Sequence, residues 1–330
     1  MKFSHLLLPF LALLVTSCEV EFSPNAAWKE TPVVYCVLDQ DDDTSWVRVE
    51  KCFLGEGSIY SYGHIADSVN YPQGALRVTL VAHRNGQAVD SMDFTYTLRQ
   101  RDTGLFAGSL QPAYFCVTKG RLKEDCRYVL NIRRTSDGAL IASNSSSPLA
   151  LIRQTNEVLI RKPSNTGKFG FYDDGPNLEI VWNALENARR YQPRVRFYYE
   201  EYGDTHFVDL LCGNRTVTGN AQTYSLLYPR NQFLVDLRNA LQHDTASKRY
   251  VRTADIYLTA CDEQLNAYMN MATQTTSIED GRQQYSNVDG GLGIVAARRT
   301  HLYKTVPVDS SDKANAGLHF FLKELGIGFE

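Results

Sequence analysis

The sequence predicts a mainly β protein with two β-sandwich domains of the immunoglobulin type, the second carrying short inserted helices and a C-terminal helix. Apolar and polar residues alternate with a period of two in many short segments, for example Trp46–Phe53 and Arg127–Arg133. Polar turns separate these segments about every ten residues, which is the spacing typical of such sandwiches. The length of 330 residues exceeds what one small core usually holds, so the sequence favours two domains.

The N-terminus has the pattern of an export signal. Lys2 precedes the apolar run Leu6–Val15, which is shorter than the roughly 20 residues that a membrane-spanning helix needs. Thr16-Ser17-Cys18 then places a cysteine directly after two small residues. This run resembles the lipobox of bacterial lipoproteins, and the resemblance implies cleavage after residue 17 and attachment of fatty acyl chains, palmitate among them, to Cys18. The alternative is an ordinary secreted protein in which Cys18 is incidental.

The expected organisation has four parts. Glu19-Val20-Glu21 partly resembles the acidic export tag of Bacteroidota lipoproteins, so we expect an outer-membrane lipoprotein, with a preference for the outer face. Ser143–Pro148 is polar and is typical of a linker, which places a domain border near residue 152. The parts are a signal peptide at 1–17, a lipidated tether at 18–30, an N-terminal sandwich at 31–152 and a second sandwich at 153–330.

In the first domain the alternating pattern predicts strands at 32–38, 46–53, 76–81, 94–98, 114–117 and 127–133. The intervening segment 54–74 has no period and contains four glycines. Long loops in compact domains often carry function, so we expect a binding loop here, with Tyr60, Tyr62 and His64 as its candidate contact residues.

The second domain is predicted to mix strands with helices. Trp182 at the end of one strand and Tyr191 before the next are similar to the opening of fibronectin type III domains, and the resemblance implies that both rings lie in the core. Ser311 is placed to cap the last helix and Gly326 to end it. Strands are expected at 157–161, 177–182, 194–200, 205–211 and 252–259, and helices at 231–241, 262–271 and 311–326.

With Cys18 assigned to lipid, an even number of cysteines remains, which permits disulfides in an exported chain. Cysteines on neighbouring strands would form two disulfides, and the two remaining cysteines would be left to form a third. The alternative is that some of the six are buried free thiols. No Cys-x-x-Cys pair and no histidine at ligand spacing occurs, so we expect no metal site. The candidate pairs are Cys36 with Cys52, Cys116 with Cys126, and Cys212 with Cys261.

One acidic segment partly matches the pattern of a calcium-binding loop. Asp39, Asp41, Asp43 and Glu50 stand at its positions 1, 3, 5 and 12, but Thr44 replaces the required glycine. We therefore predict a solvated hairpin turn.

Composition and motifs exclude several functional classes. A net charge of −3 argues against a nucleic-acid partner. The sequence lacks a serine-hydrolase elbow, a zinc-peptidase motif and a phosphate loop, so we expect no cofactor and no catalytic residue. Hydrolysis of glycans or peptides by an unidentified pair of acids remains an alternative.

The most distinctive stretch of the mature chain is Tyr285–Ala297. Its residues Tyr285, Ser286, Asn287, Gly290, Gly291 and Gly293 form a run similar to the C-terminal signature of a family of Bacteroidota outer-membrane lipoproteins of unknown activity, often encoded beside TonB-dependent receptors. Val295–Ala297 departs from that signature, in which a phenylalanine and a glycine are usual. On physical grounds the glycines allow positive φ or a close approach to another strand, so we predict a turn that leads into a last strand.

The family resemblance implies a non-enzymatic binding or accessory role at the outer membrane, beside a TonB-dependent receptor. A surface adhesin or a structural assembly lipoprotein is the alternative, because such proteins share the lipid anchor and the sandwich domains.

Overall fold

The computed structural model describes residues 29–52, 65–100, 110–153, 158–161, 169–171, 177–217, 219–241, 248–273, 285–308 and 318–330. The signal peptide, Cys18 and the candidate loop residues Tyr60, Tyr62 and His64 lie outside these ranges. Within them the prediction of a mainly β protein is confirmed.

All the segments with a clear period of two form strands. The strands of the first half are β1 (Pro32–Asp39), β2 (Thr44–Lys51), β3 (Leu76–Arg84), β4 (Gln87–Gln100), β5 (Leu110–Val117), β6 (Arg127–Arg134), β7 (Leu140–Ser143) and β8 (Leu149–Ala150). Those of the second half are β9 (Val158–Arg161), β10 (Asn177–Asn183), β11 (Arg190–Glu201), β12 (Asp204–Leu211), β13 (Arg215–Thr216), β14 (Thr223–Pro229), β15 (Arg249–Cys261) and β16 (Leu292–Pro307).

Three of the helices correspond to predicted ones. They are α4 (Arg230–Ala240), α5 (Glu263–Thr273) and α6 (Leu318–Glu324), while α3 (Ala66–Val69) lies in the segment predicted as a loop. Phe233 and Leu237 of α4 and Leu318 and Leu322 of α6 are buried, so both helices cover the core. The expected cap Ser311 lies outside the described residues.

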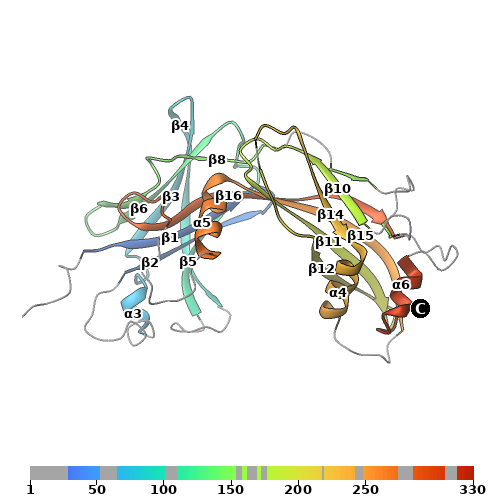
Figure 1. Cartoon of the computed structure of the whole chain (residues 1–330). Helices are drawn as coiled ribbons and strands as arrows, with labels where there is room; N and C mark the ends of the chain where they lie inside the picture. Colours follow the sequence, from blue (N-terminus) through green and yellow to red (C-terminus); the bar gives the residue numbers. More distant parts are fainter. Residues whose placement is uncertain are drawn as a thin grey trace, which may run out of the picture.

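One large mixed sheet runs through both halves of the molecule, in the strand order β12-β11-β15-β16-β1-β2-β5-β4-β3-β6-β7. β13 and β8 pair with β11 and β6 beside this path, and β14-β10-β9 form a separate small sheet. Figure 1 shows the halves as the two limbs of an arch, with β16 running from one to the other.

The large sheet folds back on itself in the first half. The sheet turns back within β4, because Phe94 pairs with β3 whereas the following residue, Thr95, already pairs with β5. The two layers enclose fully buried side chains such as Val34, Leu80 and Leu130. Apolar residues at alternate positions of each strand face this interior, which is why the period of two predicts it.

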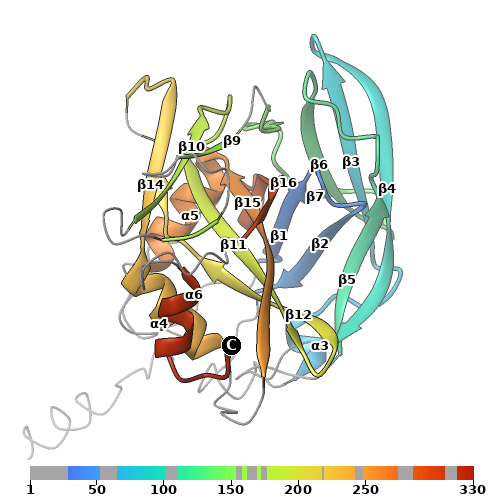
Figure 2. The same ribbon diagram turned by 90° about the vertical axis from the view of Figure 1, so that its right-hand side faces the viewer.

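The small sheet covers the large one in the second half, as the turned view in Figure 2 shows. Trp182 of β10 packs edge-on against Tyr191 of β11, with 5.3 Å between ring centroids. Phe197 of β11 contacts Phe233 of α4. Aromatic rings therefore fill most of this core, as the abundance of tyrosine and phenylalanine allows.

β16 joins the two halves through two different pairings. From Leu292 to Arg298 it runs parallel to β1, and from Arg298 to Pro307 it runs antiparallel to β15. Arg298 pairs with both strands, so β16 changes its partner at this residue. The predicted turn leading into a last strand is thus confirmed, and that strand completes the sheet of both halves.

Two glycines allow β1 to approach the start of β16. Gly293 has φ +104°, and a Cβ there would overlap the carbonyl oxygen of Val34. A Cβ on Gly291 would lie 2.6 Å from the carbonyl oxygen of Pro32. A side chain at either position is incompatible with the observed pairing of β1 with β16.

Substitution of Gly293 by alanine should therefore destabilise the whole chain. We expect Gly293→Ala to lower the free energy of unfolding by about 3 kcal/mol or more, since it combines positive φ with a backbone overlap. Gly203→Ala is the matched control, because Gly203 has φ +87° but nothing within 4 Å of its Cβ position. It should cost only about 1 kcal/mol. Equal losses in chemical denaturation followed by circular dichroism would contradict the close approach.

Candidate functional site

β11 presents two different faces. Alternate residues such as Tyr191, Val195 and Phe197 are buried in the core, while Arg190, Gln192 and Arg194 are half-buried on the opposite face. The side chains separate in this way because successive residues of a strand point to opposite sides of the sheet. The face that carries the arginines is the one on which α5 lies.

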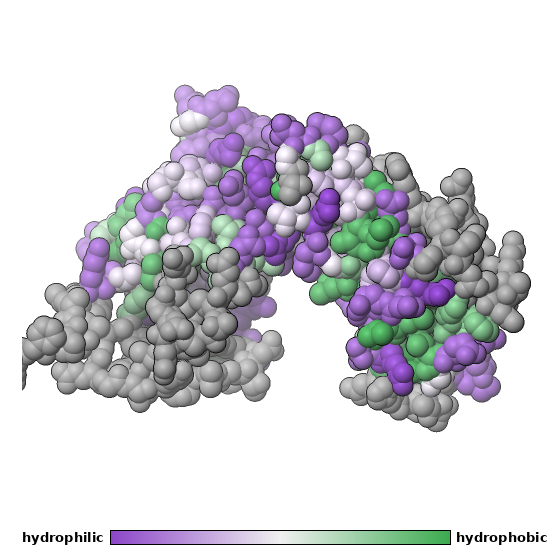
Figure 3. Space-filling model, viewed as in Figure 1, coloured by the Kyte–Doolittle hydropathy of each residue, from purple (hydrophilic) through white to green (hydrophobic). Residues whose placement is uncertain are grey.

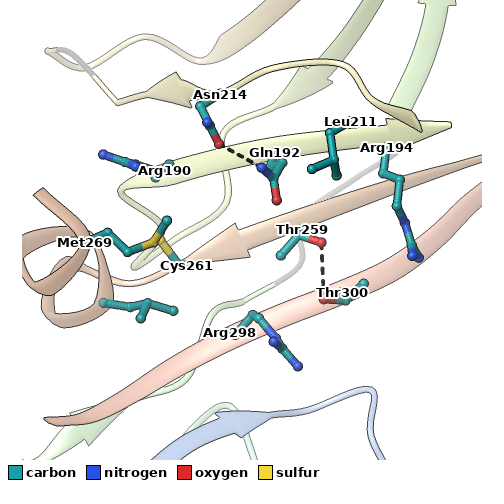
Figure 4. Close-up of a pocket in the computed structure, with 11 residues that line it drawn as sticks. Arg190, Gln192, Arg194, Leu211, Asn214, Thr259, Cys261, Met269, Arg298 and Thr300 are labelled. Carbon is teal, nitrogen blue, oxygen red and sulfur yellow. Dashed lines mark hydrogen bonds between the residues drawn. The ribbon is translucent and has the colours of Figure 1, made fainter. Parts of the chain in front are cut away.

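A cavity of about 440 Å³ lies between α5 and this face of β11, β15 and β16. Its volume falls within the range of small-molecule sites. Figure 4 shows the side chains that several strands contribute to it. The lining residues are Arg190, Gln192, Arg194, Leu211, Asn214, Thr259, Cys261, Leu265, Met269, Arg298 and Thr300.

The three lining arginines are held by different partners. Arg190 donates to the side-chain oxygens of Asn266, at 2.9 Å, and of Asn270, both of α5. Its guanidinium forms no ion pair with any carboxylate among the described residues. Neutral amides therefore position this charge without balancing it.

The other two arginines are each balanced by an acid outside the lining. Arg194 binds Asp209 at 2.8 Å and stacks on the ring of Tyr257, with its guanidinium 4.4 Å from the ring centroid. Arg298 binds Asp39 at 2.9 Å. No carboxylate occurs among the described residues that line the cavity, so its interior is cationic.

The rest of the lining is partly polar and partly apolar. Gln192 donates to Asn214 at 3.2 Å, and the hydroxyls of Thr259 and Thr300 lie 3.2 Å apart. Leu265 and Met269 of α5 and Leu211 of β12 supply an apolar wall. Burial raises the pKa of the Cys261 thiol to about 11, so this side chain is neutral at physiological pH.

Asp262 fixes α5, and with it one wall of the cavity, to β16. One carboxylate oxygen accepts the N–H of Leu265 in the first turn of α5 at 2.9 Å, and the other accepts the N–H of Ala297 at 3.0 Å. Asp262 is only 5 % exposed, and its burial raises the pKa of the carboxyl to about 6. The sequence predicted the helix at this place, but not this contact with the last strand.

A second groove lies on the same sheet face, lined by residues that include Tyr35, Trp46, Arg48 and Arg99. Tyr268 of α5 packs edge-on against Tyr35, so the helix stands between the two hollows. The arginines of this groove are already engaged, because Arg99 stacks on Trp46 at 4.1 Å and Arg48 pairs with Glu50 at 2.9 Å. The cavity beside Arg190 is therefore the stronger candidate site.

The residues of the family-like motif hold the start of β16. The side chain of Asn287 donates to the carbonyl oxygen of Val295 at 2.7 Å and accepts its N–H at 2.9 Å, as a paired strand would. Ser286 accepts the N–H of Val288, and Tyr285 donates to Gln264 of α5. These contacts are structural, and they lie beside the cavity without lining it.

The segment predicted as a linker is a fixed turn. Asn144 is fully buried and its side chain accepts the N–H of Leu130 at 2.7 Å. Asp289 accepts hydrogen bonds from the hydroxyl and N–H of Ser146 and from the hydroxyl of Ser145, which lower the pKa of its carboxyl. The motif and this turn thus lock together, near the bridge between Ser143 and Asp289.

The candidate disulfides are not formed in the structure. Cys36 pairs in register with Val47, whereas Cys52 lies at the other end of the β1–β2 hairpin, where its N–H bonds Thr31. Cysteines so far apart along a hairpin cannot be bridged. All six candidate cysteines are free thiols, namely Cys36, Cys52, Cys116, Cys126, Cys212 and Cys261. Each of them is buried except Cys52, which is half-buried.

The acidic turn between β1 and β2 is a hairpin as predicted, but part of it is not solvated. Asp39 is 3 % exposed and pairs with Arg298, and Asp41 lies 3.5 Å from both Arg299 and His301. β16 therefore neutralises Asp39 and Asp41, whereas Asp43 pairs with Lys119 and Glu50 with Arg48. The described ranges contain no group of three or more His, Cys, Asp or Glu side chains that could hold a metal ion.

Comparison with models of protein families finds no match for this chain, and comparison with curated proteins finds none either. The family resemblance therefore rests on features of the sequence, of which Tyr285–Ala297 is the most specific. Among the helices that the structure describes, none has both the length and the apolar character to cross a membrane.

Sequence reasoning missed the cavity, although one signal for it was present. Arg190, Gln192, Arg194 and Arg196 stand at alternate positions, the last two in the strand predicted at 194–200 and the first two directly before it. Such a pattern indicates a cationic sheet face. It could not show that α5 and Arg298, distant in sequence, would enclose that face.

The raised pKa of Asp262 predicts a pH effect on stability. Between about pH 4 and 6 the unfolded chain loses this proton before the folded chain does, so the free energy of unfolding falls as pH rises. The difference in unfolding free energy between wild type and Asp262→Asn should therefore shrink by up to about 3 kcal/mol between pH 4 and pH 7. Denaturant titrations of both proteins across this range measure it. A difference that stays constant or grows with pH would show that the carboxyl has no raised pKa.

Proposed function

We propose that this chain is a lipid-anchored, non-enzymatic binding or accessory lipoprotein of the outer membrane, and that it holds an anionic ligand in the arginine-lined cavity. The observation that carries the proposal is the charge of that cavity. Arg190, Arg194 and Arg298 reach it from two strands, and no described carboxylate lines it. A cationic, partly apolar hollow of this size suits a small molecule or a charged end group with negative charge.

Arg190 is the residue through which the cavity would bind an anion most directly. A guanidinium presents several N–H donors in one plane and matches a carboxylate, sulfate or phosphate group with two parallel hydrogen bonds. Arg194 and Arg298 already share their charge with Asp209 and Asp39. Among the described residues the side chain of Arg190 has amide partners and no carboxylate partner, so an incoming anion competes with no described acid for it.

The lining favours binding over hydrolysis. Glycoside hydrolysis uses a pair of carboxyl groups that flank the scissile bond, and the described lining offers none. The Cys261 thiol is protonated at neutral pH and is a poor nucleophile in that form. The hydrolase alternative thus finds no support at this cavity.

Anchoring and partner come from the sequence. The run that ends at Cys18 supports a lipid anchor, and Glu19-Val20-Glu21 supports the outer face of the membrane. The resemblance of Tyr285–Ala297 supports a TonB-dependent receptor as partner. A surface adhesin would have the same anchor but no receptor, so purification from membranes separates the two.

A fibronectin type III-like arrangement of the second half belongs to the same proposal. In its support, β14-β10-β9 face β12-β11-β15-β16, which gives seven strands in two layers. The contact between Trp182 and Tyr191 in the core agrees with the resemblance noted for these two residues.

The anchor can be tested by substituting its cysteine. We expect Cys18→Ala to move the protein from the membrane pellet to the soluble fraction, because burial of acyl chains contributes roughly 0.8 kcal/mol per CH₂ group. Cys52→Ala is the control and should stay in the membrane. Mass spectrometry of proteins that co-purify with the wild type then identifies a receptor. Retention of Cys18→Ala in the pellet would contradict lipid anchoring.

The anion site can be tested at Arg190. Its partners are neutral, so Arg190→Gln leaves no buried acid unpaired, unlike substitution of Arg298. We expect it to weaken binding of citrate, measured by calorimetry, by about tenfold or more. Arg77→Gln on the exposed face of β3 is the control and should bind as the wild type does. An unchanged affinity of Arg190→Gln for citrate would contradict the proposed anion site.

A further inference from the structure

We infer that the ligand of the arginine-lined cavity is an acidic sugar, of one or two residues, that carries a carboxylate or a sulfate group. The inference rests on the proposed function, because it assigns a ligand class to the same cavity. It follows from how the lining combines charged, polar and apolar groups, rather than from the arginines alone.

The uncharged polar groups of the lining are suited to hydrogen bonds with hydroxyl groups of a ligand. The side chains of Gln192 and Asn214, and the hydroxyls of Thr259 and Thr300, can each donate and accept hydrogen bonds. Each pair is joined by a single contact, of 3.2 Å in both cases, which leaves further donors and acceptors on every member. A simple anion would use only the guanidiniums. A ligand with several hydroxyl groups uses these four side chains as well.

The apolar wall fits the remaining surface of a sugar. Leu265 and Met269 of α5 face the polar strands across the cavity, as Figure 4 shows for Met269. A sugar ring has C–H groups on its faces and hydroxyls around its edge, so it can contact this wall and the polar side chains together. None of the lining residues that the structure describes is aromatic, so they offer no ring on which a nucleotide base would stack.

Size and position fit a short saccharide. A volume of about 440 Å³ lies toward the lower end of the range for enclosed small-molecule sites, which suits one or two sugar rings. Leu211 at the rim is 56 % exposed, so the cavity is open on the β12 side and can admit the end of a longer chain. The space-filling view in Figure 3 shows the arch hollowed on its underside.

The test compares four probes with the full mature chain by isothermal titration calorimetry. Glucuronate and glucose 6-sulfate carry both features, glucose lacks the charge, and citrate lacks the sugar ring. We expect at least one acidic sugar to bind about tenfold tighter than either glucose or citrate. The carboxylate and sulfate arms show which acidic group the site prefers.

Two variants connect the result to the lining. Arg190→Gln should remove the preference for glucuronate over glucose. Thr300→Val keeps the shape of the side chain and should weaken the acidic sugar about fivefold while leaving citrate unchanged. Circular dichroism verifies that both variants fold.

The outcomes separate this inference from the function it rests on. If citrate binds as tightly as the acidic sugars, or if Thr300→Val weakens both equally, the cavity is a simple anion site and the sugar assignment is wrong, while the proposed function stands. If none of the four probes binds, the sugar assignment and the anion site of the proposed function are both wrong.

Discussion

The structure depends on the pairing of one strand with two partners. β16 forms parallel hydrogen bonds with β1 over Leu292–Arg298 and antiparallel ones with β15 over Arg298–Pro307. Gly291 and Gly293 make the first pairing sterically possible, because a side chain at either would overlap the backbone of β1. Neither half can complete its sheet without this strand, so the halves share one sheet.

The cavity depends on the same strand. Arg298 and Thr300 enter it from β16, and Asp262 ties the start of α5 to the N–H of Ala297 in that strand. The balance of charge follows from this arrangement. Arg298 meets the buried Asp39 of β1, whereas the side-chain partners of Arg190 in the described part of the chain are amides of α5. One arginine therefore holds the structure together, and another keeps its charge available to a ligand.

Much of the secondary structure was predictable, because it follows from local patterns. The period of two identified most strands, and Phe233 and Leu237 marked the buried side of α4. β14 was missed because the exposed Leu227, which stands next to Leu226, obscures the alternation between Tyr224 and Tyr228. The cysteine pairs were chosen from sequence proximity, but register separates Cys36 from Cys52.

The sequence by itself determined which side of each strand is buried, where the turns fall, and that glycines are needed before the last strand. These properties depend on a few adjacent residues and on the burial of apolar side chains. Tertiary structure alone decided which strands are neighbours, that Asp39 would face Arg298 from 259 positions away, and that three arginines would surround one cavity. Such contacts depend on the register between distant strands, because a shift of one residue turns a side chain to the other face of the sheet.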